Sequence, residues 1–414
     1  MAMIGNIPLG GHSTVGISGV PMLCGVAFDL VEGASADFTY TPDGTLWEVE
    51  LRAGQSTVVA RTALELERTD VLSAGLEWTQ RCLDLLSFEQ RSDLVLATPG
   101  DTHLLVFVRD RALVLQHVVV SSLQVSVNVE AVVKDKDGNV KVQAPPPVVW
   151  SPGLRYYRLS QASRDLYEAY RNLFLGLEAL LHAICPKTPE EREREWLLRA
   201  VSAVGKQVNL KHFVPSEITD PPAYIVGTQY DHIRCRLFHA KSPFASDSFD
   251  IPSPEEVVSA YERLVRLWRQ IARDCLSVRC GGGGGMTYDG FKMMMDNALS
   301  NELSMYFTED PSPAKKADTK VSPLGKKIYP FRNVAYHSET APGRVSFLGS
   351  HPISEVENLP IVHRICAKTR DALMTACCVE EGLEMSDVDV FESFQTIRLR
   401  NRDLPNIAFG GEHA

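Results

Sequence analysis

The sequence predicts an α+β protein of several domains. We expect an antiparallel β-rich domain over 1–150, a four-helix bundle over 154–280, a glycine linker over 281–285 and a small α+β region over 286–414. Three observations predict this fold class. The length of 414 residues corresponds to two or three domains of ordinary size. The apolar pattern changes from alternating to helical spacing near residue 154, and five consecutive glycines follow the last helical stretch.

The N-terminal third is expected to be an antiparallel sheet with one helix packed on it. Residues 1–20 show no clear period and predict a loose arm or an irregular edge segment. Strands over 38–40 and 46–51 are expected around a Pro-Asp-Gly turn. Apolar residues at spacings of three and four predict a helix over 71–87. The remaining strand-rich runs are 92–97, 103–108 and 112–132.

The middle third has the pattern of four helices. One long apolar stripe over 159–184 predicts a single helix, and two more helices are expected over 189–204 and 223–240. Ser253 as N-cap and Pro254 at the first helical position predict the start of the fourth helix. Four helices joined by short loops are typical of an up-and-down bundle.

The last third has a weaker pattern. Residues 311–330 are rich in Pro, Lys and Asp and are expected to form a loop. Strands are expected over 345–348 and 391–399, and a helix over 359–383. The sequence therefore predicts a small α+β region here.

Charge and cysteine usage exclude several classes of protein. The net charge is −10, distributed as −8 over 1–154, +2 over 155–280 and −4 over 281–414. Only the middle third is therefore suited to face a phosphate backbone, and a protein or small-ligand trigger is expected at the N-terminal domain. The sequence contains no membrane span and no signal peptide, and none of its nine cysteines forms a C-x-x-C pair. We therefore expect a cytoplasmic protein with reduced thiols and neither cofactor nor metal.

The stretch 230–241 concentrates the groups that RNA cleavage requires. It contains His232, Arg234, Arg236, His239 and Lys241 within twelve positions. Arginine binds phosphate oxygens, and histidine exchanges a proton near neutral pH. Cleavage without a metal needs a base for the 2′-OH, a cation for the phosphorus centre and an acid for the leaving oxygen.

Arg234, four intervening residues and His239 match the Arg-x4-6-His signature of HEPN domains. The helix-forming sequence 166–181, the segment 193–196 and the segment 233–242 together resemble the Apea-like HEPN subfamily over about 155–280. The resemblance implies a HEPN-like bundle that forms a homodimer with two motifs across a shared cleft. It also implies metal-independent ribonuclease activity, frequently in bacterial toxin or anti-phage systems. Cys235 stands where members of the family often carry Asn, Asp or His.

Two functions remain open at this point. On a regular α-helix Arg234 and His239 lie about 140° apart, so a bent side chain, a helix end or a second subunit is needed to unite them. His232, Arg236 and His239 share one face, which makes Arg236 a second candidate. Arg234 paired with a carboxylate such as Glu178 indicates instead a non-catalytic HEPN scaffold that binds protein or nucleotide partners. In that scaffold His239 caps a helix C-terminus.

Overall fold

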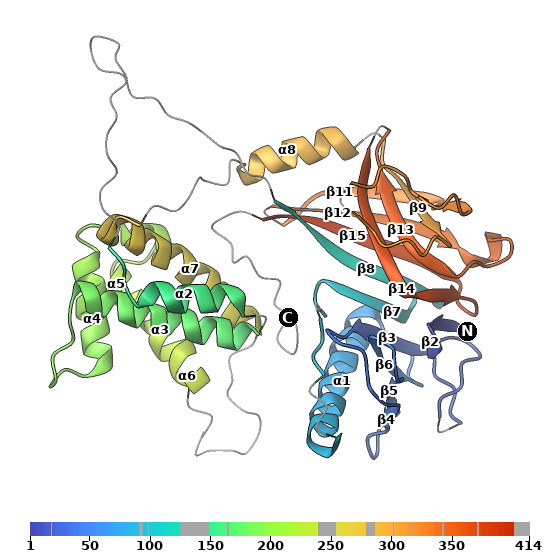
Figure 1. Ribbon diagram of the computed structural model, residues 1–414, viewed down its shortest axis with the longest axis horizontal. Coiled ribbons are helices and arrows are strands. Elements are labelled where there is room, and N and C mark those ends of the chain that lie inside the picture. The colour runs from blue at the N-terminus through green and yellow to red at the C-terminus, as the bar shows by residue number, and fades with distance from the viewer. Residues whose placement is uncertain are drawn as a thin grey trace, which may run out of the picture.

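Two β-sheets and one set of helices make up the protein (Figure 1). The computed structural model describes residues 1–17, 19–90, 94–97, 99–124, 149–163, 165–238, 254–278, 286–300, 302–315, 317–341, 343–370 and 372–400. No helix within these ranges is long and apolar enough to cross a membrane.

The larger sheet has nine strands in the order β11-β12-β15-β8-β7-β3-β6-β5-β4. Neighbouring strands are antiparallel except β15 and β8, which pair in parallel from Val390 opposite Val114 onward. Strands from both ends of the chain are therefore hydrogen-bonded in one sheet. Their bounds are β3 (Cys24–Asp29), β4 (Phe38–Tyr40), β5 (Trp47–Leu51), β6 (Thr57–Thr62), β7 (Thr102–Arg109), β8 (Ala112–Gln124), β11 (Asn333–Ala341), β12 (Arg344–Pro352) and β15 (Val390–Arg400).

The smaller sheet has six antiparallel strands in the order β10-β9-β13-β14-β1-β2. It also joins the two ends of the chain, because Ala2 of β1 lies opposite Met385 of β14. The strand bounds are β1 (Ala2–Ile4), β2 (Ile7–Gly10), β9 (Ser304–Thr308), β10 (Ile328–Pro330), β13 (Val362–Lys368) and β14 (Leu373–Met385).

Two apolar cores hold these strands together. One core joins the sheets, because Leu104 and Leu115 of the larger sheet cluster with Ile4 and Phe307 of the smaller sheet. Helix α8 (Tyr288–Leu299) and the 3₁₀ turn η3 (Ile353–Glu355) contribute to the same core. Helix α1 (Arg68–Gln90) packs on the larger sheet and forms the second core with strands β3 and β7. We call the two sheets with α1 and α8 the β body.

The helical region, residues 153–276, has a core of its own. Its close packing is evident between α2 and α3, where a Cβ on Gly153 would lie 2.7 Å from the carbonyl oxygen of Gly176. Buried Trp196, Leu197 and Ala200 confirm the expected inward face of the helix over 189–204. The elements are α2 (Gly153–Ala162), α3 (Leu166–Ile184), α4 (Glu193–Val204), η1 (Leu210–Phe213), α5 (Pro221–Val226), η2 (Gly227–Arg234), α6 (Cys235–Phe238) and α7 (Pro254–Leu276).

The predicted fold class is wrong in its arrangement. The protein is α+β and mostly β, and its described residues contain no four-helix bundle. The expected helix over 159–184 is broken, because Ser163 is extended and Asp165 caps α3 by accepting a 2.6 Å hydrogen bond from the Glu168 amide. The expected helix over 223–240 is present as continuous helical backbone over 221–238, with a π-helical middle: it consists of α5, the π-helical segment η2 and α6.

The expected separation of an N-terminal sheet from a C-terminal α+β region is also wrong, because the two ends share both sheets. The expected helix over 359–383 is in fact β13 and β14, which pair with each other and with the distant strands β9 and β1. Of the two expectations for 1–20, the loose arm is wrong and the edge segment is the better one. The range contains β1 and β2, β2 is the edge strand of the smaller sheet, and Ile4 and Ile7 are buried. The helix cap at Ser253 and the glycines 281–285 lie outside the described residues.

Candidate functional site

Arg234 is the last residue of the π-helical segment η2, and its side chain turns toward α3. Its Nη2 atom lies 3.8 Å from Oε1 of Glu178, and its guanidinium lies 5.3 Å from the centre of the Tyr230 ring. The Arg234 side chain is 20% exposed and that of Glu178 is 18% exposed. π-Helical turns are rare and occur frequently at functional sites. The structure therefore brings the motif arginine together with one of the predicted supporting residues.

Glu178 is a carboxyl group that takes up a proton near neutral pH. Its pKa is raised to about 7, chiefly because burial disfavours the charged form, and Glu193 contributes in the same direction. Arg234 and Lys187 oppose this rise. Oε1 of Glu178 is buried and accepts no hydrogen bond from the described residues. The ion pair with Arg234 is therefore too long to compensate fully for the loss of water around the carboxylate.

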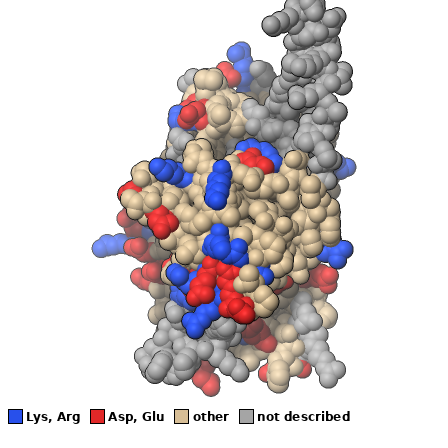
Figure 2. Space-filling view, turned by 90° about the vertical axis from the view of Figure 1, so that its left-hand side faces the viewer, with Lys and Arg blue, Asp and Glu red and all other residues tan. Residues whose placement is uncertain are grey.

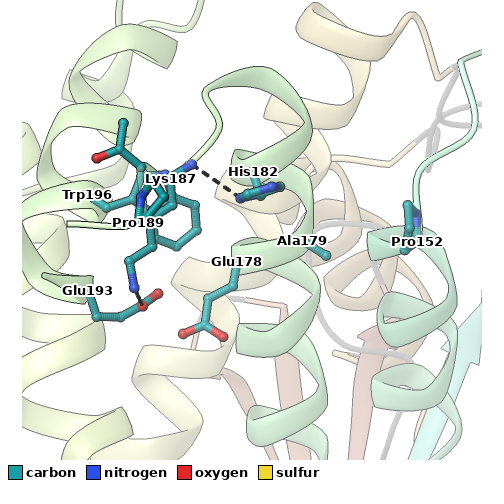
Figure 3. A pocket seen from close by; sticks show the side chains of 9 residues that line it. Pro152, Glu178, Ala179, His182, Lys187, Pro189, Glu193 and Trp196 are labelled. Carbon is teal, nitrogen blue, oxygen red and sulfur yellow. Dashed lines mark hydrogen bonds and ion pairs between the residues drawn. The ribbon is translucent and has the colours of Figure 1, made fainter. Parts of the chain in front are cut away.

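Glu178 also lines a cavity of about 570 Å³, which we call the motif cavity (Figure 3). Glu178 lies between Pro152, which directly precedes α2, on one side and the Lys187–Glu193 ion pair, at 2.5 Å, on the other. His182, one turn further along α3, accepts a 3.3 Å hydrogen bond at Nδ1 from the Lys187 amide. Neutral His182 therefore carries its ring proton on Nε2. The complete lining is Pro152, Glu178, Ala179, His182, Lys187, Thr188, Pro189, Glu193 and Trp196.

The other predicted site residues face a different helix. Nε2 of His232 lies 3.3 Å from Glu256 of α7, and Nη1 of Arg236 lies 3.8 Å from the same carboxylate. His232 and Arg236 are thus brought together on α7, whereas Arg234 pairs with α3. His239 and Lys241 lie outside the described residues.

The surface around the motif cavity carries charges of both signs. On the face shown in Figure 2, Lys and Arg side chains are interspersed with Asp and Glu, and much of the face is uncharged. Two of the arginines of α4 are paired, Arg194 with Asp231 at 2.9 Å and Arg199 with Glu191 at 2.7 Å. This surface has no continuous basic stripe in the part of the chain that is described, so any contact with RNA must be local.

Sequence reasoning missed His182 and Lys187 as site residues. His182 follows Glu178 by four positions on one helix, so helical spacing alone was enough to place both on one face. Lys187 reaches the cavity from the turn after α3, where Trp196 donates a 2.8 Å hydrogen bond to the Cys185 carbonyl and holds the turn against α4. That tertiary contact has no signature in the local sequence.

Comparisons of the chain with protein-family models, curated proteins and solved structures found no match. The resemblance to HEPN domains therefore depends on the residues of the chain itself, above all on Arg234 and His239 and on the segments 166–181, 193–196 and 233–242.

Proposed function

We propose that the helical region is a metal-independent endoribonuclease of HEPN type. The observation that carries the proposal is that Glu178, whose pKa is raised to about 7, lines the motif cavity and lies 3.8 Å from Arg234. The ion pair by itself indicates the scaffold function, whereas a cavity beside a carboxyl group that exchanges a proton near neutral pH favours catalysis. A guanidinium that binds phosphate oxygens and a carboxyl group with a pKa of about 7 supply two of the three functions that RNA cleavage needs.

In the proposed reaction Glu178 removes the proton from a ribose 2′-OH. The 2′ oxygen attacks the adjacent phosphorus, the bond to the 5′ oxygen of the next nucleotide breaks, and a 2′,3′-cyclic phosphate forms. Arg234 stabilises the added negative charge on the phosphoryl oxygens. His239, in the role that the family resemblance implies, protonates the departing 5′ oxygen. No redox partner or added reactant enters this step.

The proposal is tested by incubating the full chain with end-labelled tRNA and with total RNA, with and without EDTA. We expect cleavage in both conditions and fragments that end in 2′,3′-cyclic phosphate. The absence of any cleavage at micromolar protein contradicts the enzyme assignment, and cleavage that EDTA abolishes contradicts the metal-independent mechanism.

The burial of Arg234 favours a second function, that of a non-catalytic HEPN scaffold. Both side chains of the Arg234–Glu178 pair are more than three-quarters buried, as in a structural ion pair. The mixed charge in Figure 2 also suits a protein partner better than an extended RNA. A folded wild-type chain that binds a partner and cleaves no RNA supports this alternative.

The proposal extends to assembly and context. A homodimer with η2 and α7 near the two-fold axis completes the site, as the HEPN resemblance implies, and light scattering at high micromolar concentration tests it. A monomeric mass contradicts the shared site. A cytoplasmic toxin or anti-phage role is part of the same proposal, and the eight cysteines in the described ranges, all of them free thiols, suit a reducing compartment.

A further inference from the structure

The β body contains a second cavity, of about 340 Å³, that the ribonuclease proposal does not use. We call it the inter-sheet cavity, because β3, β6, β7 and β8 of the larger sheet and β1 and β14 of the smaller sheet line it. Its polar lining includes Asp29, Thr57, His117, Glu380 and Glu381. Both ends of the chain are needed to build this cavity.

His117 is the buried polar side chain that points to a ligand. It is 3% exposed, and its pKa is lowered to about 4 by burial and by His103, so the ring is neutral at pH 7. Leu113 and Leu115, four and two positions earlier on β8, lie in the core between the sheets, so His117 projects toward the same side. Its Nδ1 lies 3.4 Å from Oγ of Ser393, and Nε2 makes no hydrogen bond with the described residues.

The carboxylates that line the cavity supply further hydrogen-bond acceptors for which the described chain offers no donor. Oε1 of Glu381 accepts from the backbone and hydroxyl of Ser56, whereas its Oε2 is buried and accepts nothing from the described chain. Asp29, the last residue of β3, is exposed to solvent where it lines the cavity. Its pKa is raised to about 6 by partial loss of water around the carboxylate and by the charges of Glu381 and Glu380. These carboxylates therefore repel one another across the cavity.

The lining of the inter-sheet cavity contains no lysine or arginine that could relieve this repulsion. No three His, Cys, Asp or Glu side chains within the described ranges are placed to hold a metal ion. The lining also contains aliphatic side chains, Ile4, Leu30 and Leu104 among them, beside Ser56, Thr102, His103 and Cys378. A cavity of about 150 Å³ holds one benzene ring, so this cavity accommodates roughly a dozen non-hydrogen atoms.

We propose that the inter-sheet cavity binds a small organic amine with a short apolar body. The protonated nitrogen donates to the carboxylates of Asp29 and Glu381, and the apolar body lies against the aliphatic lining. In the tautomer whose Nδ1–H donates to Ser393, Nε2 of His117 accepts a third hydrogen bond from the ligand. This proposal is independent of the ribonuclease activity and gives the expected small-ligand trigger a chemical class.

Isothermal titration of the full chain with matched ligands tests the proposal. Tryptamine and hexylamine are compared at pH 7.5 with tryptophol and 1-hexanol, which have the same skeletons and no charge. We expect each amine to bind at least about tenfold more tightly than its alcohol, because a desolvated charge-assisted hydrogen bond contributes more than a neutral one. Amines that bind no more tightly than the alcohols overturn the proposal.

Two variants and one control identify the site. Asp29→Asn and Glu381→Gln should each reduce the preference for the amine to about threefold or less. Asp84→Asn, on the exposed face of α1, should leave it unchanged. Asp29 makes no side-chain hydrogen bond in the described structure, so Asp29→Asn is expected to fold even where Glu381→Gln disturbs Ser56. A preference that survives in folded Asp29→Asn, or that Asp84→Asn also removes, overturns the assignment to this cavity.

Discussion

The helical region and the β body each surround a cavity with a carboxyl group of raised pKa, but the causes differ. Burial raises the pKa of Glu178 to about 7 against the opposing charge of Arg234. Partial loss of water raises the pKa of the more exposed Asp29 to about 6, and two neighbouring carboxylates add to the rise. In the helical region, Glu178 lies beside a cation of the chain itself, which suits proton transfer. In the β body, no cation lines the cavity around Asp29, which suits the binding of a cationic ligand.

The two regions also differ in how the chain builds them. The helical region is one continuous stretch with its own core, whereas each sheet of the β body needs strands from both ends of the sequence. The parallel pairing of β8 with β15 joins residues 276 positions apart. Contacts of that separation form only after a large loss of chain entropy. The two regions should therefore respond very differently to truncation.

The largest expected effect is on folding of the isolated fragment 1–150. It lacks β15, the neighbour of β8, and β14, the neighbour of β1. We expect no cooperative thermal transition by circular dichroism, whereas a fragment over 149–278 should melt cooperatively because its core is complete. A folded 1–150 fragment with native-like dispersion in its NMR spectrum contradicts the shared-sheet topology.

The next effect concerns RNA cleavage by variants of the motif. Arg234→Lys keeps a positive charge beside Glu178 but loses the planar set of donors, so we expect a loss of about 10²–10³-fold in rate. His239→Ala should cost about 10²–10⁴-fold if that side chain transfers a proton. Rates are measured under single-turnover conditions, with folding checked by circular dichroism.

Arg266→Ala, on the exposed surface of α7, is the matched control and should change the rate less than threefold. Folded Arg234→Lys and His239→Ala proteins that both cleave at the wild-type rate contradict the ribonuclease proposal. If Arg234→Lys alone is destabilised, the pair with Glu178 is structural and the scaffold function gains support.

Local patterns in the sequence predicted elements that local contacts stabilise. The strands β4 and β5 around their Pro-Asp-Gly turn and the inward face of α4 were predicted from spacing alone. The segment over β13 and β14 was misassigned, because its apolar residues also fit helical spacing. The pairing of the two strands with each other and with the distant strands β9 and β1 makes the segment part of the sheet. The pairing between β8 and β15 could not be predicted from the sequence either, because the register between distant strands leaves no local pattern.

The candidate site was predicted only in part, for the same reason. Glu178 was named in advance as the partner of Arg234, and the two side chains do meet. The π-helical segment that ends at Arg234 was not foreseen, since the sequence was read with the period of a regular α-helix. The inter-sheet cavity was missed altogether, because Asp29, His117 and Glu381 are united only by the two sheets.

A smaller effect is the contribution of the raised pKa of Glu178 to the stability of the folded chain. The pKa of Glu178 is above its ordinary value of 4.5, so the folded chain binds more protons than the unfolded chain between about pH 4.5 and 7. Stability contributed by the neutral form is therefore lost as the pH rises through about 7. Glu178→Gln, which stays neutral, should be more stable than the wild type at pH 8 by up to about 3 kcal/mol, at roughly 1.4 kcal/mol for each unit of pKa.

Urea denaturation of wild type and Glu178→Gln at pH 5 and pH 8 measures this difference. The gain should be small at pH 5, where Glu178 is already protonated in the folded chain. A gain of equal size at both pH values indicates a packing effect and contradicts the assigned ionisation. Single-turnover rates of RNA cleavage by the wild type, measured between pH 5 and pH 8, should rise toward pH 7 if Glu178 accepts the 2′-OH proton.

The smallest expected effects compare one ion pair from each region. Arg194 and Asp231 of the helical region meet at 2.9 Å with side chains 55% and 39% exposed, whereas Arg398 and Asp101 of the β body meet at 2.8 Å with side chains 18% and 19% exposed. Solvent screens the first pair, so Arg194→Ala should cost at most about 1 kcal/mol, and less at high salt. Arg398→Ala leaves the poorly hydrated Asp101 without its donors and should cost about 1–3 kcal/mol with little dependence on salt. Urea denaturation at 0.05 and 0.5 M NaCl measures both costs, and an Arg194→Ala cost equal to that of Arg398→Ala would show that exposure does not set the strength of these pairs.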